Sequence, residues 1–212
     1  MEIEYSNFDI NKEIFQENKI NGLIDLNSNL LYNKIYNIQK VKYNYNQKVK
    51  YFFLKELLNN SNILKTLEED FYINKEVLNR KMEELSTSEL CKTLLIKACL
   101  SDAKVIILKN IDMYFNDRDL KDLFFVLKKH IEKIKKTIIF STSKIDNIIL
   151  NVDNYIIARE NEVLYSGNSI SSLNEKTDII EFVDAANKKG AKLHYYKDRN
   201  DLLKAIYRSV KK

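Results

Sequence analysis

Residues 85–143 carry the pattern on which the expected architecture rests. They open with LSTSE at 85–89, and a helix-like run follows over 90–100. The apolar segment VIILKN at 105–110 comes next, and TIIFSTS at 137–143 follows after a long amphipathic segment. Short apolar runs without alternation are typical of strands covered on both faces, as in a parallel sheet. The stretch therefore predicts helix, buried strand, helix, buried strand, in which the second helix is the crossover that parallel strands need.

This order resembles the second half of an ABC-transporter ATP-binding subunit. In that family the signature L-S-G-G-[EQ] opens a helix, an apolar strand ends in Asp-Glu, and a later strand ends in Ser-Thr-His. The corresponding positions here are Leu85 to Glu89 for the signature, Lys109 and Asn110 for the acidic pair, and Ser143 for the histidine. The layout of the family is kept, whereas its catalytic residue types are replaced.

The resemblance covers about Ile20 to Gly167 and implies a P-loop ATPase-like α/β fold with a mostly parallel sheet flanked by helices. It also implies a degenerate ATP-binding domain over residues 1–176, which includes a small helical subdomain at about 48–84. Residues 177–212 are expected to form a short α+β C-terminal appendage, of the kind that many bacterial members carry.

A phosphate-binding loop would lie between the expected strand Ile20 to Asp25 and the expected helix Leu30 to Gln39. Such a loop needs G-x-x-x-x-G-K-[ST], because backbone N–H groups wrap the phosphates and the lysine reaches them. In this degenerate phosphate loop the glycine positions hold Asp25, Ser28 and Leu30, the lysine position holds Leu31, and the hydroxyl position holds Tyr32. Taken alone, the segment is a strand, a turn and a helix; its place before residues 85–143 identifies it with the lost loop.

Two interpretations of the signature-like motif remain open. Ser-x-x-Glu before an apolar run is a capping box, in which side chains satisfy the free N–H groups at a helix start without any ligand. A helix N-terminus is also an anion site. The resemblance implies that this one would contact ATP held by a partner subunit, through Ser86, Thr87, Ser88 and Glu89. Thr87 and Ser88 replace the family's two glycines, which bears on how closely a phosphate could approach.

Gln47 falls where the family has a glutamine that senses the nucleotide and couples to the membrane subunit. A plain surface glutamine is an equally open interpretation.

The remaining elements follow from apolar spacing and turn residues. Expected strands are Glu2 to Tyr5, Lys12 to Phe15, Val41 to Tyr45, and a hairpin of Tyr155 to Ala158 with Glu162 to Tyr165 around Asn161. Expected helices are Lys48 to Asn59, Ile63 to Met82, Asp119 to Lys136, and Ile145 to Leu150. The tail is expected to form a helix capped by Gly190, a strand over Lys192 to Tyr196, and a helix over Asp201 to Val210.

Composition favours a folded cytoplasmic protein. The chain has 212 residues and a net charge of +5. It has no apolar run long enough for a bilayer and no secretory signal in its first residues. Cys91 and Cys99 lie eight apart on one expected helix, too far for a disulfide, so they are expected to be reduced packing residues. No residue spacing suggests a metal site.

The lysines are scattered, with one local cluster that we expect to be a solvated helix face: Lys128, Lys129, Lys133, Lys135 and Lys136. His130 is expected to be a surface residue among them. We expect no nucleic-acid partner, because a concentrated basic stripe with aromatic residues is missing from the pattern.

The lost motifs predict a non-catalytic subunit. Leu31, Lys109, Asn110 and Ser143 stand where the family has the phosphate-loop lysine, the magnesium ligand, the catalytic glutamate and the histidine. The resemblance implies pairing with an active ATPase and a transmembrane permease at the inner face of the membrane, in bacterial export or immunity. Any ATP would be shared in trans rather than bound by the chain's own loop.

Two alternatives remain: a pseudoenzyme scaffold that binds a protein without nucleotide, and a nucleic-acid-associated P-loop protein. We also expect Lys109 to pair with Asp25 or a loop carbonyl in the vacated pocket, the alternative being that both side chains turn to solvent.

Overall fold

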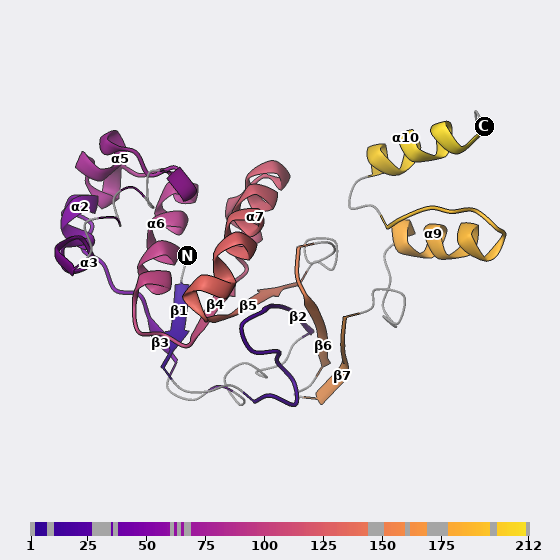
Figure 1. Cartoon of the computed structure of the whole chain (residues 1–212), viewed down its shortest axis with the longest axis horizontal. Helices are drawn as coiled ribbons and strands as arrows, with labels where there is room; N and C mark the ends of the chain where they lie inside the picture. The colour runs from indigo at the N-terminus through magenta and orange to yellow at the C-terminus, as the bar shows by residue number, and fades with distance from the viewer. Residues whose placement is uncertain are drawn as a thin grey trace.

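The structure is a computed structural model that describes residues 3–7, 11–26, 35, 38–59, 62, 65, 69–143, 151–159, 162–168, 178–195 and 199–210. Figure 1 shows the whole chain. Its strands are β1 (Ile3–Ser6), β2 (Ile20–Leu26), β3 (Gln39–Lys40), β4 (Val105–Lys109), β5 (Thr137–Thr142), β6 (Asn154–Arg159) and β7 (Glu162–Gly167). Its α-helices are α2 (Val49–Phe52), α3 (Leu54–Asn59), α5 (Lys75–Asn79), α6 (Thr87–Leu100), α7 (Asp117–Ile134), α9 (Asp178–Lys188) and α10 (Arg199–Val210); the short 3-10 helices are η1 (Met82–Glu84) and η2 (Ile111–Tyr114).

The strands form one mixed sheet in the order β3-β1-β4-β5-β2-β6-β7. Its centre, β4-β5-β2-β6, is parallel, whereas β1, β3 and β7 run antiparallel to their neighbours. The fold is therefore α/β with a mostly parallel sheet, as expected, and the helix, strand, helix, strand order of residues 85–143 is confirmed. The expected hairpin is also confirmed as β6 and β7, although Asn161 lies outside the described residues.

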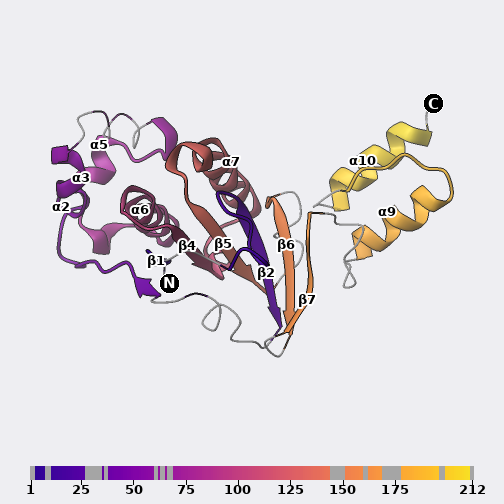
Figure 2. The same cartoon turned by 60° about the horizontal axis from the view of Figure 1, so that its bottom comes forward.

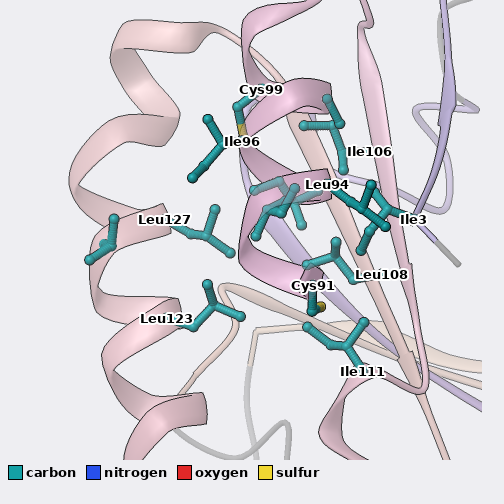
Figure 3. Packing of buried hydrophobic residues seen from close by; sticks show 14 of the residues in the cluster. Ile3, Cys91, Leu94, Ile96, Cys99, Ile106, Leu108, Ile111, Leu123 and Leu127 are labelled. Carbon is teal, nitrogen blue, oxygen red and sulfur yellow. The ribbon is translucent and has the colours of Figure 1, made fainter. Parts of the chain in front are cut away.

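The apolar runs of β4 and β5 are buried on both faces of the sheet. Ile106 and Leu108 join one apolar cluster with α6 and α7, whereas Val105 and Ile107 join another cluster with Phe15 and Ile35 on the opposite face. Figure 3 shows the first cluster, in which side chains of α6 lie between α7 and the sheet. Two covered faces explain why these strands lack the alternation of a half-exposed strand. Cys91 and Cys99 are free and buried in α6, as expected.

The helical subdomain is more broken than its sequence suggested. The expected helix Lys48 to Asn59 is interrupted at Phe53, between α2 and α3. The single helix expected over Ile63 to Met82 is wrong: within its described part, Tyr72 has a left-handed backbone (φ 57°), and α5 begins only after Asn74. The Asn74 side chain accepts a hydrogen bond from the N–H of Val77 and so starts a new helix.

Two of the strands expected before α2 are wrong. The strand at Lys12 to Phe15 is wrong, because Asn11 folds the chain into a turn by accepting from the N–H groups of Glu13 and Phe15. The strand at Val41 to Tyr45 is also wrong, since the pairing with β1 occurs at β3 instead. Most of the helix expected at Leu30 to Gln39, and all of Ile145 to Leu150, lies outside the described residues.

A buried amide network fastens the connection before β2 to the sheet, through Gln16. Asn21 and Asn154 are directly opposite in the register of β2 and β6, and their side chains are 0% and 1% exposed. The Asn154 Nδ2 donates to Asn21 Oδ1 at 3.0 Å, and Asn21 Nδ2 donates to the carbonyl of Gln16 at 2.9 Å. The N–H of Gln16 returns a bond to Asn21 Oδ1 at 2.8 Å. The network ties the connection before β2 to two neighbouring strands.

His130 is buried, which corrects the expectation of a surface residue. It is 8% exposed, its Nε2 lies 2.9 Å from Asp70 Oδ2, and its ring stacks on Phe71 at 5.7 Å. On α7 it lies seven residues after the buried Leu123, so the helical repeat places it at the edge of the apolar face. The neighbouring lysines concealed this position in the sequence.

Lys136 is buried, which corrects the expectation that its lysine cluster is a solvated helix face. It is 6% exposed, and its Nζ donates to the carbonyls of Ser101 and Ala103, at 2.5 Å each. Burial lowers its pKa. Lys135 takes the left-handed C-cap conformation (φ 48°) and thereby turns Lys136 inward, toward the end of α6. Within the same cluster, Lys129 is exposed and pairs with Asp70 at 2.6 Å.

The C-terminal helices α9 and α10 lie beyond β7, at the end of the molecule away from α2 and α3, as Figures 1 and 2 agree. The expected cap at Gly190 is confirmed by its φ of 91°. The strand expected over Lys192 to Tyr196 is wrong in its described part. The Asn187 side chain instead donates to the carbonyl of Leu193 and accepts from its N–H, at 2.9 Å each.

Candidate functional site

The carboxyl ends of β2, β4 and β5 meet at one edge of the sheet, where ligands bind in open α/β sheets. Lys109 ends β4 beside Ser141, and Thr142 lies beside Ile24 of β2. Ser143 follows directly and is exposed. The positions in β4 and β5 that the sequence analysis expects to be degenerate are thus brought to the same edge as the end of β2.

The phosphate-loop positions can be placed only in part. Asp25 belongs to β2 and pairs with Ala158 in the register of β6. Its side chain lies outside the described part of the chain, as do Ser28, Leu30, Leu31 and Tyr32. The Lys109–Asp25 pair therefore stays a prediction; Lys109 itself is half-buried.

The backbone conformation at residue 110 explains why an asparagine occupies this position. Its backbone is left-handed (φ 49°, ψ 34°), and its N–H donates to the carbonyl of Ser141 at 2.8 Å. Asn tolerates this conformation better than most residues. Asn110 therefore follows the end of β4 and directs the chain into η2. Its side chain is a neutral amide.

Asp112 is an acidic residue at this edge that the motif comparison missed. Its Oδ2 accepts a hydrogen bond from Thr142 Oγ1 at 2.8 Å, and Thr142 is 2% exposed. The contact links η2 to the end of β5. The only sequence signal was an acidic residue two positions after Asn110, and its placement depends on the turn that Asn110 makes.

The two residues that end β4 carry no carboxylate. A catalytic Mg²⁺ site is built from carboxylate and other oxygen ligands, whereas β4 ends in the ammonium of Lys109 and the amide of Asn110. No group of three or more His, Cys, Asp or Glu suited to a metal occurs among the described residues.

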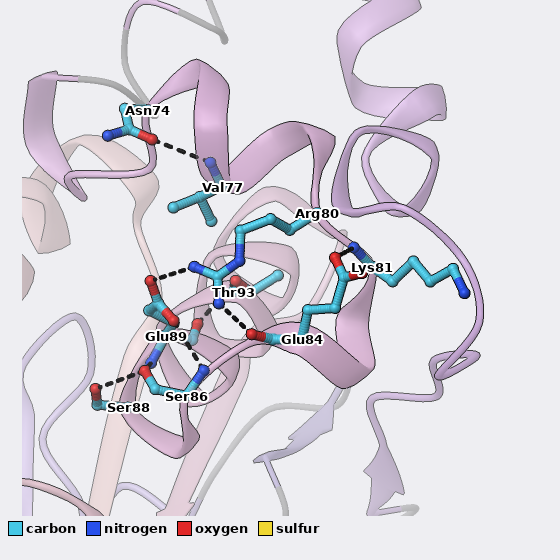
Figure 4. A network of polar contacts seen from close by, with 9 residues as sticks. All are labelled: Asn74, Val77, Arg80, Lys81, Glu84, Ser86, Ser88, Glu89 and Thr93. Carbon is cyan, nitrogen blue, oxygen red and sulfur yellow. Dashed lines mark hydrogen bonds and ion pairs between the residues drawn. The ribbon is translucent and has the colours of Figure 1, made fainter.

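The start of α6 is a complete capping box, shown in Figure 4. The Ser86 Oγ accepts from the N–H of Glu89 at 3.3 Å, and the N–H of Ser86 donates to Glu89 Oε2 at 2.8 Å. Ser88 Oγ lies 3.4 Å from Ser86 Oγ. Ser86 and Thr87 remain exposed. The signature-like residues thus cluster at a helix start, and the capping interpretation of Ser86 and Glu89 is confirmed.

Arg80 fixes this helix start to the helical subdomain, and sequence reasoning missed it. Its Nη1 lies 3.0 Å from Glu89 Oε1, and its Nη2 donates to the carbonyl of Glu84. Burial by itself would raise the pKa of Glu89, but the hydrogen bonds from Ser86 and the ion pair with Arg80 outweigh it and lower the pKa. Glu89 is therefore a structural anion, and its carboxylate is bonded to Ser86 and Arg80 of the same chain.

Gln47 lies beside the segment that leads into α6. Its carbonyl accepts from the N–H of Met82 at 3.0 Å, and Lys48 forms an isolated β-bridge with Lys81. The backbone thus connects the Gln47 turn to η1, just before Ser86.

A hollow of about 570 Å³ lies elsewhere, between β1, β3 and the end of α6. Tyr5, Lys42, Ala98 and Ser101 are among its lining residues. Tyr5 pairs with Ile106 near the beginning of β4, so this hollow is separate from the carboxyl edge of the sheet.

No protein-family model matches the chain, and no curated protein matches its sequence. Solved structures do match its fold. CbiO1 from Clostridium perfringens, part of the ABC transporter complex cbiONQ, is 12% identical with a TM-score of 0.56, over 88% of this chain and 92% of that one. MJ1267, an ATP-binding cassette of an ABC transporter in its ADP conformation, is 12% identical with a TM-score of 0.58, over 90% and 100%.

The archaeal ribosome recycling factor aABCE1, solved with the ribosomal stalk protein aP1, is 16% identical with a TM-score of 0.57. The match covers 81% of this chain and 37% of that one. Together with the sheet order and the position of α6, these matches show that the chain has the fold of an ABC-type ATP-binding cassette.

Proposed function

We propose that the chain is a non-catalytic ATP-binding-cassette subunit that pairs with an active ATPase and a transmembrane permease, in export or immunity. The observation that carries this proposal is the end of β4, where Lys109 and Asn110 occupy the edge at which such a fold would hold an acid on Mg²⁺ and a glutamate on water. A cation there opposes a metal, and an amide takes no proton from water.

The first test is hydrolysis by the isolated chain. We expect no Mg²⁺-dependent release of phosphate from ATP above a mock preparation, because loss of even one such group costs a few kcal/mol of transition-state stabilisation. Phosphate release that follows the protein through purification would overturn the proposal.

The second test concerns the signature-like motif in a complex with an active partner. Ser86→Asp keeps a capping oxygen and adds a negative charge, whereas Ser86→Ala removes the cap and adds none. If ATP is contacted in trans, Ser86→Asp lowers the partner's turnover well below that of Ser86→Ala, because the added charge repels the phosphates. Asn7→Glu, at an exposed residue after β1, serves as the charge control. Equal turnover for all variants in an assembled complex would contradict the contact.

A scaffold that binds a protein partner without nucleotide is the second candidate. It is supported by the start of α6, where Glu89 is engaged by Ser86 and Arg80, and where Thr87 and Ser88 carry side chains that glycines would lack. Co-purification with an ATPase, together with no binding of a fluorescent ATP analogue to the assembled composite site, would favour the scaffold.

A further inference from the structure

Positive charge is concentrated in the C-terminal part of the chain. Residues 178–212 carry nine Lys and Arg against five Asp and Glu, whereas the whole chain carries 35 against 30. Nearly all of the net charge of +5 therefore comes from α9, α10 and their flanking residues. Two of the five acids are engaged there: Asp201 pairs with Lys204 at 3.1 Å, and Asp184 accepts from the Tyr195 hydroxyl at 2.6 Å.

The helix α10 separates its side chains into three stripes. Leu202 is buried, as are Ile180 and Val183 of α9. Leu203 and Tyr207, four residues apart, form an apolar stripe that is 43% and 70% exposed. Lys204 and Arg208, each one position further, form an exposed basic stripe beside it, in which Lys204 also pairs with Asp201 one turn earlier. Residues four apart lie on the same side of a helix, so the two exposed stripes run side by side.

We propose that α10 lies on the surface of an anionic lipid bilayer, with Leu203 and Tyr207 in the headgroup boundary and Lys204 and Arg208 on lipid phosphates. Amphipathic helices with a basic face bind such surfaces in the plane of the membrane. Basic residues beside the bilayer gain from its negative surface potential, and tyrosine suits the boundary between water and acyl chains. At 12 residues α10 is too short to cross a bilayer. No helix in the described part of the chain has the length and apolarity that crossing requires.

Lipid is favoured over nucleic acid by the apolar stripe. Phosphate contacts on a nucleic acid would use Lys204 and Arg208, but they would leave Leu203 in water, whereas a bilayer accommodates both stripes at once. The inference does not depend on the ATPase partnership, because it concerns a different end of the molecule.

Co-sedimentation of the full chain with vesicles tests the proposal. We expect binding to vesicles of phosphatidylcholine with about 30% phosphatidylglycerol, weak binding to phosphatidylcholine alone, and loss of binding as salt rises through screening. The double variant Leu203→Ser/Tyr207→Ser should bind at least about tenfold more weakly, since it removes the apolar stripe. Lys204→Glu/Arg208→Glu should abolish the preference for the anionic lipid.

Matched controls lie at the far end of the molecule. Leu58→Ser changes a residue of α3 that is 77% exposed, and Lys75→Glu changes an exposed residue of α5. Both should leave vesicle binding unchanged, and circular dichroism should show every variant folded. The proposal is overturned by no binding to anionic vesicles or by equal losses in the controls. It is also overturned if Tyr207→Ser disrupts only binding to RNA or DNA, or only self-association in sedimentation velocity.

Discussion

At the scale of single residues, Ser86 controls how α6 begins. Ser86→Ala removes the oxygen that accepts from the N–H of Glu89, and we expect the free energy of unfolding to fall by about 1 kcal/mol. Chemical denaturation at neutral pH measures this loss. Asn7→Ala, which shortens an exposed polar side chain outside any helix, is the control; a loss of the same size there would contradict the capping role.

Glu89 should give stability a dependence on acid pH. Its pKa is lowered in the folded chain, so its contribution is fully present above the unfolded value of about 4.3 and is lost as the pH falls through the folded value. Glu89→Gln keeps an oxygen for the capping box but no charge for Arg80. As the pH falls below about 5, the wild type should therefore lose more stability than this variant, as measured by urea denaturation at each pH. Parallel curves for the two proteins would refute the assignment.

The capping box could be predicted from the sequence because its residues are three apart on one helix. Arg80 could not, since its contact with Glu89 requires α5 and α6 to come together in space. Asp112 was missed for a similar reason: it reaches Thr142 only because Asn110 adopts a left-handed backbone. Local spacing thus indicated Glu89 but not its partner Arg80. Both contacts depend on the tertiary packing, which local spacing does not report.

At the scale of elements, α6 protects its thiols. Burial raises the pKa of Cys91 and of Cys99 to about 12. The thiolate is the reactive species, so both residues should resist labelling by a disulfide reagent at pH 8 until the chain unfolds. The labelling rate should rise with urea in step with the loss of circular dichroism. Rapid labelling of the native chain would mean that α6 opens locally.

The helix α7 should depend on Asp70 for its attachment to the helical subdomain. Asp70 contacts both His130 and Lys129, and its side chain is 17% exposed. Asp70→Asn keeps the size but removes the charge, and we expect a loss of about 1–3 kcal/mol in the free energy of unfolding. Lys129→Ala, at an exposed residue, should cost less. Thermal denaturation compares the two; a larger loss for Lys129→Ala would contradict the ranking.

Elements buried on both faces were the ones that the sequence predicted well. The strands β4 and β5 contain continuous apolar runs, VIIL and IIF, because packing against both layers selects apolar residues on both faces. The strand β2 has fewer apolar residues, since its sequence INGLIDL includes Asn21, Gly22 and Asp25. The strands expected at Lys12 to Phe15 and Lys192 to Tyr196 failed, since Asn11 and Asn187 redirect the backbone through side-chain bonds that apolar patterns do not report.

At the scale of the whole molecule, stability should decrease from the middle of the sheet toward β7. Ile106, Ile107, Ile138 and Ile139 are 0% exposed, whereas Val163 and Leu164 of β7 are 36% and 47% exposed. Hydrogen exchange should therefore be slowest in β4 and β5, approaching the rate of global unfolding, and faster in β7. Equal protection of β7 and β4 would show that the sheet opens only as a unit.

The paired amides of Asn21 and Asn154 bear on how the sheet is assembled correctly. Side chains alternate between the faces of a strand, so sliding β6 by one residue against β2 would carry Asn154 to the opposite, apolar layer. A buried amide stranded there would cost about 1–3 kcal/mol in lost hydrogen bonds. The two asparagines thus select one alignment of β2 and β6. Apolar residues can pack in several registers, whereas these amides form their hydrogen bonds only in the register that brings Asn21, Asn154 and Gln16 together.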